Sequence, residues 1–240
     1  MYNICMQDYN NLFLNEFKKL EEILRSSTNM GERAKFHELL NKASKSNSLF
    51  EEKRNLIETM YALRNVIAHG QKDKYIAQIN NQAFDEIKNI VLLLETPPLV
   101  GLVANTPVYI ADVESSLSEL IKSMNENIYS HVPIYDNEKY IGTFSENSGL
   151  LVLNEILINS LSLNNSKISD LDFNLIFKTN DEVMFIGKEE NVFNVQNYFK
   201  NAIKKGERLG AIYITSTGSR YERPIGIITP NDIPKIKDIY

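Results

Sequence analysis

The 240-residue sequence has little cysteine, no long apolar run and no basic or apolar stretch at its start, and each of these shortages excludes a class of protein. With Cys5 as its only cysteine the chain cannot close an internal disulfide, so we expect a reducing compartment, the cytoplasm. No apolar run approaches the roughly 18 residues that a membrane-spanning helix needs, because the longest candidate, Ile90 to Leu94, ends at Glu95. The first ten residues hold neither a basic nor an apolar stretch, so we expect no signal peptide and no membrane partner.

An excess of positive charge is also missing. The chain has 26 Lys and Arg against 31 Asp and Glu, for a net charge of −5. The charges balance over residues 1–96, with 13 of each sign, so the acidic excess lies wholly in the remainder. This distribution is not that of a general nucleic-acid binder. We therefore expect no DNA partner, and any contact with RNA has to come from a local patch.

Residues 1–96 contain no proline, and their only glycines are Gly31 and Gly70. Their apolar spacing predicts helices throughout, separated by short polar breaks. The predicted helices cover residues 9–25, 32–43, 49–69 and 81–95. Gly70, directly after His69, is typical of a helix C-terminus. Four helices with short loops predict a small bundle.

The pattern changes at Thr96-Pro97-Pro98, because proline ends a helix. Beyond it, short β-branched runs alternate with helical stretches in an order that occurs twice. Each copy is a β-α-β-β-α unit, the first over about 97–162 and the second over 165–240. A single unit of about 60 residues buries little surface, so we expect the two to pack together. The predicted fold class is α+β with two domains, 1–96 and 97–240.

Two stretches of this repeat resemble the CBS domain, which occurs in tandem pairs (Bateman modules) that bind adenine nucleotides or S-adenosylmethionine. They are SHVPIYDNEKYIGTFS, Ser130 to Ser145, and GIITPND, Gly226 to Asp232. The resemblance covers about Pro97 to Tyr240 and implies ATP, ADP, AMP or S-adenosylmethionine as a regulatory ligand.

GIITPND is similar to the family's G-x-x-[ST]-x-x-D element, whose hydroxyl and carboxylate hold ribose hydroxyls. The resemblance implies that Thr229 and Asp232 contact ribose and phosphate and that Gly226 allows close backbone approach. It also implies that strand residues nearby, of which we select Ile212, sandwich the adenine. Alternatively, Thr229 to Asp232 form a helix start with a threonine cap and proline at the first position, and both interpretations can hold together.

Two further features bear on this site. The first unit has Ser148 where the carboxylate should stand, and a serine cannot chelate two hydroxyls, so we expect one good nucleotide site in the pair. A basic cluster near the second unit is either a phosphate site, in which we select Arg223, or a solvated surface. The cluster consists of Lys200, Lys204, Lys205, Arg208, Arg220 and Arg223.

The third predicted helix contains Arg64-Asn65-Val66-Ile67-Ala68-His69. On a helical wheel, one narrow stripe is expected to face the core, with Asn65 and His69 nearly opposite it and Arg64 to one side. The stripe consists of Leu56, Met60, Leu63 and Ile67. The segment resembles the R-N-x-x-x-H signature of HEPN domains, four-helix domains of which many are metal-independent ribonucleases that act as dimers. The resemblance covers about Met1 to Thr96.

The residue types fit that chemistry. A histidine can move a proton at the 2′-hydroxyl or the leaving oxygen of RNA, and a guanidinium can hold the scissile phosphate. Asn65 can orient the imidazole of His69 or bond a phosphate oxygen. Because Arg64 and His69 diverge on one helix, we expect an isologous homodimer to bring two such pairs together. No spacing of His, Cys and carboxylates predicts a metal site, so no metal is required.

The main prediction is a nucleotide-regulated, metal-independent endoribonuclease in which Arg64, Asn65 and His69 cleave RNA and the CBS pair senses an adenine nucleotide. The alternative is a noncatalytic nucleotide sensor whose helical domain is a dimeriser or an adaptor for a partner. A histidine in the last helical turn is also favoured by the helix dipole alone. A third interpretation is a structural protein with vestigial sites.

Overall fold

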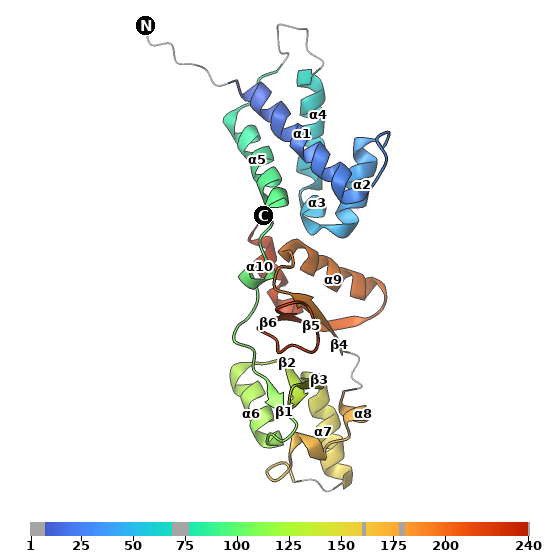
Figure 1. Ribbon diagram of the computed structural model, residues 1–240, viewed down its shortest axis with the longest axis vertical. Coiled ribbons are helices and arrows are strands. Elements are labelled where there is room, and N and C mark those ends of the chain that lie inside the picture. Colours follow the sequence, from blue (N-terminus) through green and yellow to red (C-terminus); the bar gives the residue numbers. More distant parts are fainter. Residues whose placement is uncertain (1–7, 69–76, 160–161, 178–180, 240) are drawn as a thin grey trace, which may run out of the picture. The chain divides into compact units, whose positions relative to one another are not determined.

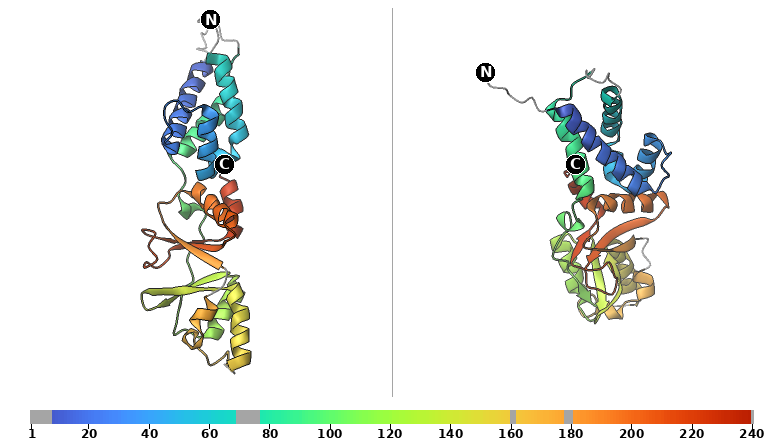
Figure 2. Two further views of the ribbon diagram at one scale, coloured as in Figure 1. Left: turned by 90° about the vertical axis from the view of Figure 1, so that its right-hand side faces the viewer. Right: turned by 45° about the horizontal axis from the view of Figure 1, so that its top comes forward.

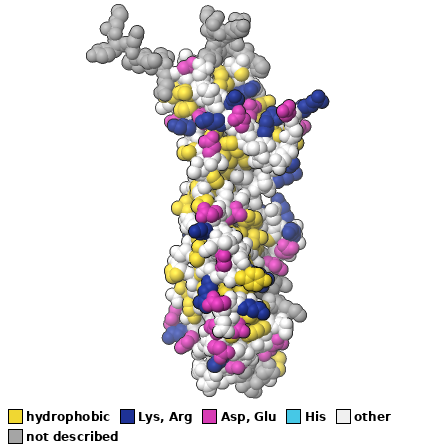
Figure 3. All heavy atoms as spheres, viewed as in Figure 1, with side chains coloured by type: hydrophobic (Ala, Val, Ile, Leu, Met, Phe, Trp, Pro, Cys, Tyr) yellow, Lys and Arg dark blue, Asp and Glu magenta, His cyan; other side chains and the backbone are white. Residues whose placement is uncertain are grey.

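The structure is a computed structural model, and it describes residues 8–68, 77–159, 162–177 and 181–239. The chain separates into two compact units, Met1–Pro98 and Leu99–Tyr240 (Figure 1). Within the described residues, no helix combines the length and apolar character that crossing a bilayer requires. On the face drawn in Figure 3, acidic and basic side chains are intermixed.

The described part of the first unit forms five helices rather than the four predicted. They are α1 (Tyr9–Thr28), α2 (Phe36–Ser46), α3 (Ser48–Glu52), α4 (Arg54–Ala68) and α5 (Asn81–Glu95). The predicted helix 49–69 is divided at Lys53, whose ψ of 9° departs from regular helix geometry. The side chain of Asn47 starts α3 by accepting a hydrogen bond from the Leu49 N–H at 2.9 Å. The end of the predicted helix, His69, lies outside the described residues.

An aromatic core holds this unit together. Phe13, Phe17, Leu20 and Leu24 recur at helical spacing along α1 and are fully buried. The Phe17 ring contacts the rings of Phe36 and Tyr61, whose centroids lie 4.2 Å apart in a parallel stack. Figure 2 shows α1 lying beside α5, and these two helices form the most extensive helix pair of the unit.

The face that α4 turns to the core differs from the predicted stripe. Its fully buried side chains are those of Ile57, Met60 and Ile67, whereas Leu56 and Leu63 are only half-buried. The buried face is therefore rotated toward the side of the helix that carries Ile57, because α4 packs against both α1 and the aromatic stack on α2. Arg64 lies on that same side and is half-buried.

The second unit confirms the predicted repeat. In its described part, β1 (Ala111–Asp112), β2 (His131–Asp136) and β3 (Lys139–Ser145) form one sheet, with α6 (Leu117–Asn127) and α7 (Glu146–Asn159) as its helices. The other sheet consists of β4 (Asp181–Gly187), β5 (Arg208–Thr215) and β6 (Gly226–Ile228), with α9 (Val192–Lys204) and α10 (Ile233–Lys237). In each, the first two strands are parallel and the last two antiparallel. The short run Val108-Tyr109-Ile110 predicts the first strand from the sequence, but β1 begins directly after it, at Ala111.

The segment that leads into each repeat packs on the other repeat. The 3₁₀ turn η1 (Val100–Leu102) joins the second sheet, where the Val100 N–H donates to the Glu190 carbonyl at 2.9 Å and Asn105 bridges Ile227. The segment with η2 (Ile168–Asp170) and α8 (Phe173–Ile176) instead packs into the core of the first sheet. The predicted repeats, 97–162 and 165–240, are continuous in the sequence. In the structure, the leading segment of each repeat packs against the other repeat.

Aromatic rings join the two sheets. Phe185 lies between Tyr140 and Tyr213, with centroid separations of 5.1 and 5.3 Å. The Thr143 hydroxyl lies 2.8 Å from the Tyr140 hydroxyl and 3.0 Å from that of Tyr213, so these buried polar groups satisfy one another. Burial raises the pKa of Tyr213 well above its ordinary value, which keeps its phenol neutral.

Two glycine-to-alanine substitutions are expected to act in opposite directions. A Cβ on Gly142 of β3 would lie 2.6 Å from the Phe177 ring, so Gly142→Ala should destabilise the second unit by about 1–3 kcal/mol through overpacking. Gly149 of α7 has open space around its Cβ position, so Gly149→Ala should stabilise the unit by about 0.5–1 kcal/mol. Urea denaturation of the full chain measures both, and an unchanged or raised stability of Gly142→Ala would contradict the packing at Gly142.

Candidate functional site

A cleft of about 370 Å³ opens in the second unit where the ends of the two sheets meet. One wall is the segment before β1 together with the end of β6 and the turn η3 (Pro230–Asp232), and the other is the link from α6 to β2 with the start of α7. Its lining consists of Asn105, Pro107, Val108, Tyr109, Asn127, Ile128, Tyr129, Ser130, His131, Glu146, Ile227, Thr229, Asn231 and Asp232.

The carboxylate of Asp232 is the best-connected group of the cleft. One oxygen accepts hydrogen bonds from the Thr229 N–H at 2.8 Å and from the Thr229 hydroxyl at 3.0 Å. The other lies 2.7 Å from the Lys235 ammonium, and the Asn105 amide donates to both oxygens at 3.0 Å. The helix-cap interpretation of Thr229 to Asp232 thus describes their local contacts, and the same contacts fix the carboxylate at the cleft wall.

Asp232 is ionised at neutral pH. It is 5% exposed, and burial alone would raise its pKa, but the hydrogen bonds from Lys235, Thr229 and Asn105 outweigh burial and lower the pKa below its usual value. An ionised carboxylate can accept hydrogen bonds from two neighbouring hydroxyl groups of a sugar. The arrangement can therefore hold a polyol edge, provided that Asn105 and Lys235 give way.

The corresponding position of the first repeat is committed to the fold. The Ser148 hydroxyl is fully buried, accepts a hydrogen bond from the Ser145 N–H at 3.0 Å and donates to the Ile176 carbonyl at 3.2 Å. It ties the start of α7 to the exchanged segment that ends in α8. A ligand at this position would have to break a buried contact of the first core.

Of the five residues selected from the sequence for ligand binding, the structure brings only Thr229 and Asp232 to the cleft. A Cβ on Gly226 would lie 3.1 Å from the Ala104 Cβ, so this glycine admits the exchanged segment rather than a ligand. Ile212 is fully buried on β5, where it pairs with Ile228. Arg223 lies over the Tyr135 ring and beside Glu138, at the β2–β3 turn. We therefore remove Ile212 and Arg223 from the candidate site.

The basic cluster is spread over separate contacts. Arg208 pairs with the buried Asp181 at 2.9 Å, Arg220 lies over the Tyr140 ring, and Lys205 lies 3.9 Å from Glu207. These groups occupy the rim of the second sheet, and none of the six lines the cleft as the structure describes it. The solvated interpretation fits the cluster better than a phosphate site.

Sequence reasoning missed two partners of Asp232, namely Asn105 in the cleft lining and Lys235 beside it. Lys235 could have been found, because it stands three residues after Asp232, a spacing at which helical side chains meet. Asn105 is 127 residues from Asp232, and only the exchange of segments brings them together. Tyr109 and Tyr129, which both belong to the first repeat, stack at the same cleft with centroids 5.6 Å apart.

His131 is the first residue of β2 and part of the cleft lining. Its Nδ1 lies 3.0 Å from the Ser130 hydroxyl. Burial lowers the pKa of His131, and nearby Asp181 and Glu146 oppose that change only in part. The imidazole is therefore neutral at pH 7.

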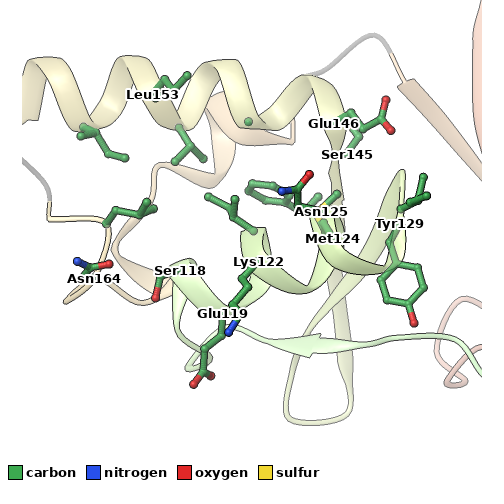
Figure 4. Close-up of a pocket in the computed structure, with 17 residues that line it drawn as sticks. Ser118, Glu119, Lys122, Met124, Asn125, Tyr129, Ser145, Glu146, Leu153 and Asn164 are labelled. Atoms are coloured by element: carbon green, nitrogen blue, oxygen red, sulfur yellow. The ribbon is translucent and has the colours of Figure 1, made fainter.

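A larger groove of about 1010 Å³ lies beside the cleft, between α6 and α7 (Figure 4). Its aliphatic lining includes Ile121 and Met124 on α6 and Val152, Leu153 and Ile156 on α7. It shares three residues with the cleft, namely Ile128, Tyr129 and Glu146. The groove lacks a buried acid and hydroxyl pair like that of Asp232 and Thr229 among its described residues, so it is the poorer candidate for recognition of a sugar.

In the first unit the structure brings Arg64 and Asn65 together, with the Arg64 guanidinium donating to the Asn65 side-chain oxygen at 3.1 Å. The same guanidinium lies 3.9 Å from Glu21 of α1. His69, the third residue of the predicted catalytic set, lies outside the described residues. The guanidinium of Arg64 is thus engaged within its own unit.

The family comparison concerns the second unit. The CBS domain family model matches residues 100–152, which lie in the first repeat. Because the second repeat has the same strand and helix order, the C-terminal part of the chain contains a CBS domain pair. No curated protein matches the chain. The helical unit has no assignment among these matches, so its HEPN resemblance stays a prediction.

Solved structures similar to this chain include three CBS proteins. The CBS domain pair of protein MJ0100, in complex with 5′-methylthioadenosine and S-adenosyl-L-methionine, is 20% identical and covers 59% of this chain and 97% of its own, with a TM-score of 0.41. CBSX2 in complex with AMP is 13% identical over 56% of this chain and 90% of its own, with a TM-score of 0.38. The CBS domain protein TA0289 from Thermoplasma acidophilum is 17% identical over 60% and 75%, with a TM-score of 0.40.

Proposed function

We propose that the CBS pair binds an adenosine-containing ligand in the cleft at Asp232, and that the protein is a ligand sensor rather than primarily an enzyme. The observation that carries the proposal is the ionised, buried Asp232 carboxylate fixed beside the Thr229 hydroxyl at a cleft wall. The family match over residues 100–152 supports the same ligand class.

The cleft offers a complementary group to each part of adenosine. The two ribose hydroxyls donate to the Asp232 oxygens and replace the Asn105 amide and the Lys235 ammonium there. The purine lies against the apolar and aromatic wall that Val108, Tyr109 and Ile227 provide. Since adenosine hydroxyls displace existing partners of Asp232, we expect moderate affinity, with Kd values in the micromolar range.

Titration calorimetry of the full chain tests the proposal. The probes are adenosine, AMP, ATP and the two compounds named for the MJ0100 complex, 5′-methylthioadenosine and S-adenosylmethionine. We expect saturable binding of at least one probe with one site per chain. Absence of heat and of any thermal stabilisation with all five probes would overturn the proposal.

We propose that the helical unit is a dimeriser or an adaptor for a partner protein that responds to the ligand. Its side chains include an exposed Leu92 on α5 and an exposed Val66 on α4, which are available for such contacts. A ligand can change the partner's affinity only if it prefers one of two arrangements of the protein.

The ribonuclease hypothesis, in which Arg64, Asn65 and His69 cleave RNA, needs a test of its own. Because the Arg64 guanidinium contacts Asn65 and Glu21, we expect purified protein to show no RNA cleavage in EDTA that depends on this residue. The measurement compares wild type with Arg64→Ala and His69→Ala on a labelled RNA. Cleavage by wild type that both substitutions abolish would restore the ribonuclease hypothesis, whereas equal cleavage by all three proteins indicates a contaminant.

A further inference from the structure

The charges around the cleft discriminate between adenosine ligands. Among the described residues that line the cleft, the charged side chains are two carboxylates, Asp232 and Glu146, and neither lysine nor arginine is present. The nearest cation on the Asp232 side, Lys235, is bound to Asp232 at 2.7 Å and donates to the Asn105 side-chain oxygen at 2.9 Å. Lys235 and Asp232 therefore neutralise one another, and Glu146 leaves the cleft with a negative charge.

The other polar groups do not reverse that sign. His131 is neutral at pH 7, and the ion pair of Asp181 with Arg208 that lies near it has no net charge. The C-terminal end of α6 and the N-terminal end of α7 both reach the cleft, and their opposite dipoles offset one another. The side-chain carboxylates therefore determine the local potential.

Resting on the function proposed above, we propose that this cleft selects adenosyl ligands without phosphate groups, either neutral like adenosine and 5′-methylthioadenosine or cationic like a sulfonium, over AMP and ATP. A phosphate group is bound in proteins by guanidinium, ammonium or several N–H donors. Here it would meet the Glu146 carboxylate, and the described lining of the cleft offers it neither lysine nor arginine. A sulfonium or ammonium group would instead find Glu146 as its counterion.

Glu146 is positioned to exert this selection. It is the first residue of α7, and its N–H donates to the Ser130 carbonyl at 3.1 Å. Its exposed side chain lines both the cleft and the apolar groove. Figure 4 shows Glu146 beside Ser145 in the lining of the groove. A substituent at the 5′ end of a ligand held at Asp232 can extend along this shared boundary. Its charge then decides whether Glu146 attracts or repels it.

Competition calorimetry on the full chain tests the selection. We expect adenosine and 5′-methylthioadenosine to bind at least tenfold more tightly than ATP, with AMP between them and S-adenosylmethionine at least as tight as adenosine. Glu146→Gln should strengthen AMP and ATP binding about 3–10-fold, weaken S-adenosylmethionine binding by a similar factor and leave adenosine unchanged. Glu155→Gln on the same helix is the matched control, because Glu155 lines neither hollow as described.

The outcomes separate the two proposals. If no adenosine compound binds, the proposed function itself fails. If ATP or AMP binds as tightly as adenosine or more tightly, the ligand function stands and the selection by charge is overturned. Loss of phosphate binding in Lys235→Ala, with Lys237→Ala unchanged, would then show that Lys235 leaves Asp232 for the phosphate. Identical selectivity of the Glu146→Gln and Glu155→Gln proteins would also overturn the proposal.

Discussion

Asp232→Ala is expected to weaken adenosine binding at least 100-fold, which removes it from the range that calorimetry detects. The substitution deletes both acceptors for the ribose hydroxyls, and a hydrogen bond to a charged group contributes about 1.5–3 kcal/mol. Two such bonds amount to about 3–6 kcal/mol, and each 1.4 kcal/mol is about tenfold in Kd. The Thr229 N–H and the Lys235 ammonium also lose their partner.

The control for this substitution is Asp238→Ala, which removes an exposed carboxylate just after α10 and should leave binding unchanged. Asp232→Asn keeps the size of the side chain and accepts through one oxygen, so its affinity should fall between wild type and Asp232→Ala. Thermal unfolding shows whether each protein is folded at the titration temperature. Full affinity in a folded Asp232→Ala protein would place the ligand elsewhere.

Phe17→Ala is expected to unfold the helical unit selectively. The Phe17 ring is fully buried and contacts the rings of Phe13, Phe36 and Tyr61, and truncation of a buried phenylalanine typically costs about 3–5 kcal/mol. Because the chain divides into two compact units with separate cores, the CBS pair should keep its structure. We expect a loss of helical circular dichroism with adenosine affinity within twofold of wild type.

Leu92→Ala is the matched control on the surface of the same unit, because Leu92 is 56% exposed and its truncation should change stability by less than about 0.5 kcal/mol. A Phe17→Ala protein that also loses its ligand would contradict independent folding of the two units. A Phe17→Ala protein with wild-type helicity would contradict the central place of this ring in the core.

The sequence predicted the elements well wherever local chemistry decides them. Proline at positions 97 and 98 ends the helical unit in agreement with the compact boundary after Pro98. The β-branched runs predicted strands in both sheets, although β1 begins only after its run. The Thr229 to Asp232 cap was also visible, since a cap involves neighbours three residues apart.

Features that depend on distant packing were not predictable in the same way. The helix break at Lys53 and the rotated core face of α4 follow from contacts with α1 and α2, which a helical wheel does not contain. Asn105 reaches Asp232 only because the leading segments are exchanged. Ile212 was selected because it lies in a predicted strand of the second repeat. In the structure its side chain is fully buried on β5, where it pairs with Ile228, so it faces the core.

The exchange of leading segments between the two repeats limits which fragments of the chain can fold. A fragment taken at the repeat boundary would lack the strip that covers its own sheet: residues 165–240 would lose Val100 and Asn105, and residues 97–162 would lose Ile168 and Ile176. Neither half is a self-sufficient module. Gene rearrangements that move the repeats singly are therefore expected to yield unstable products.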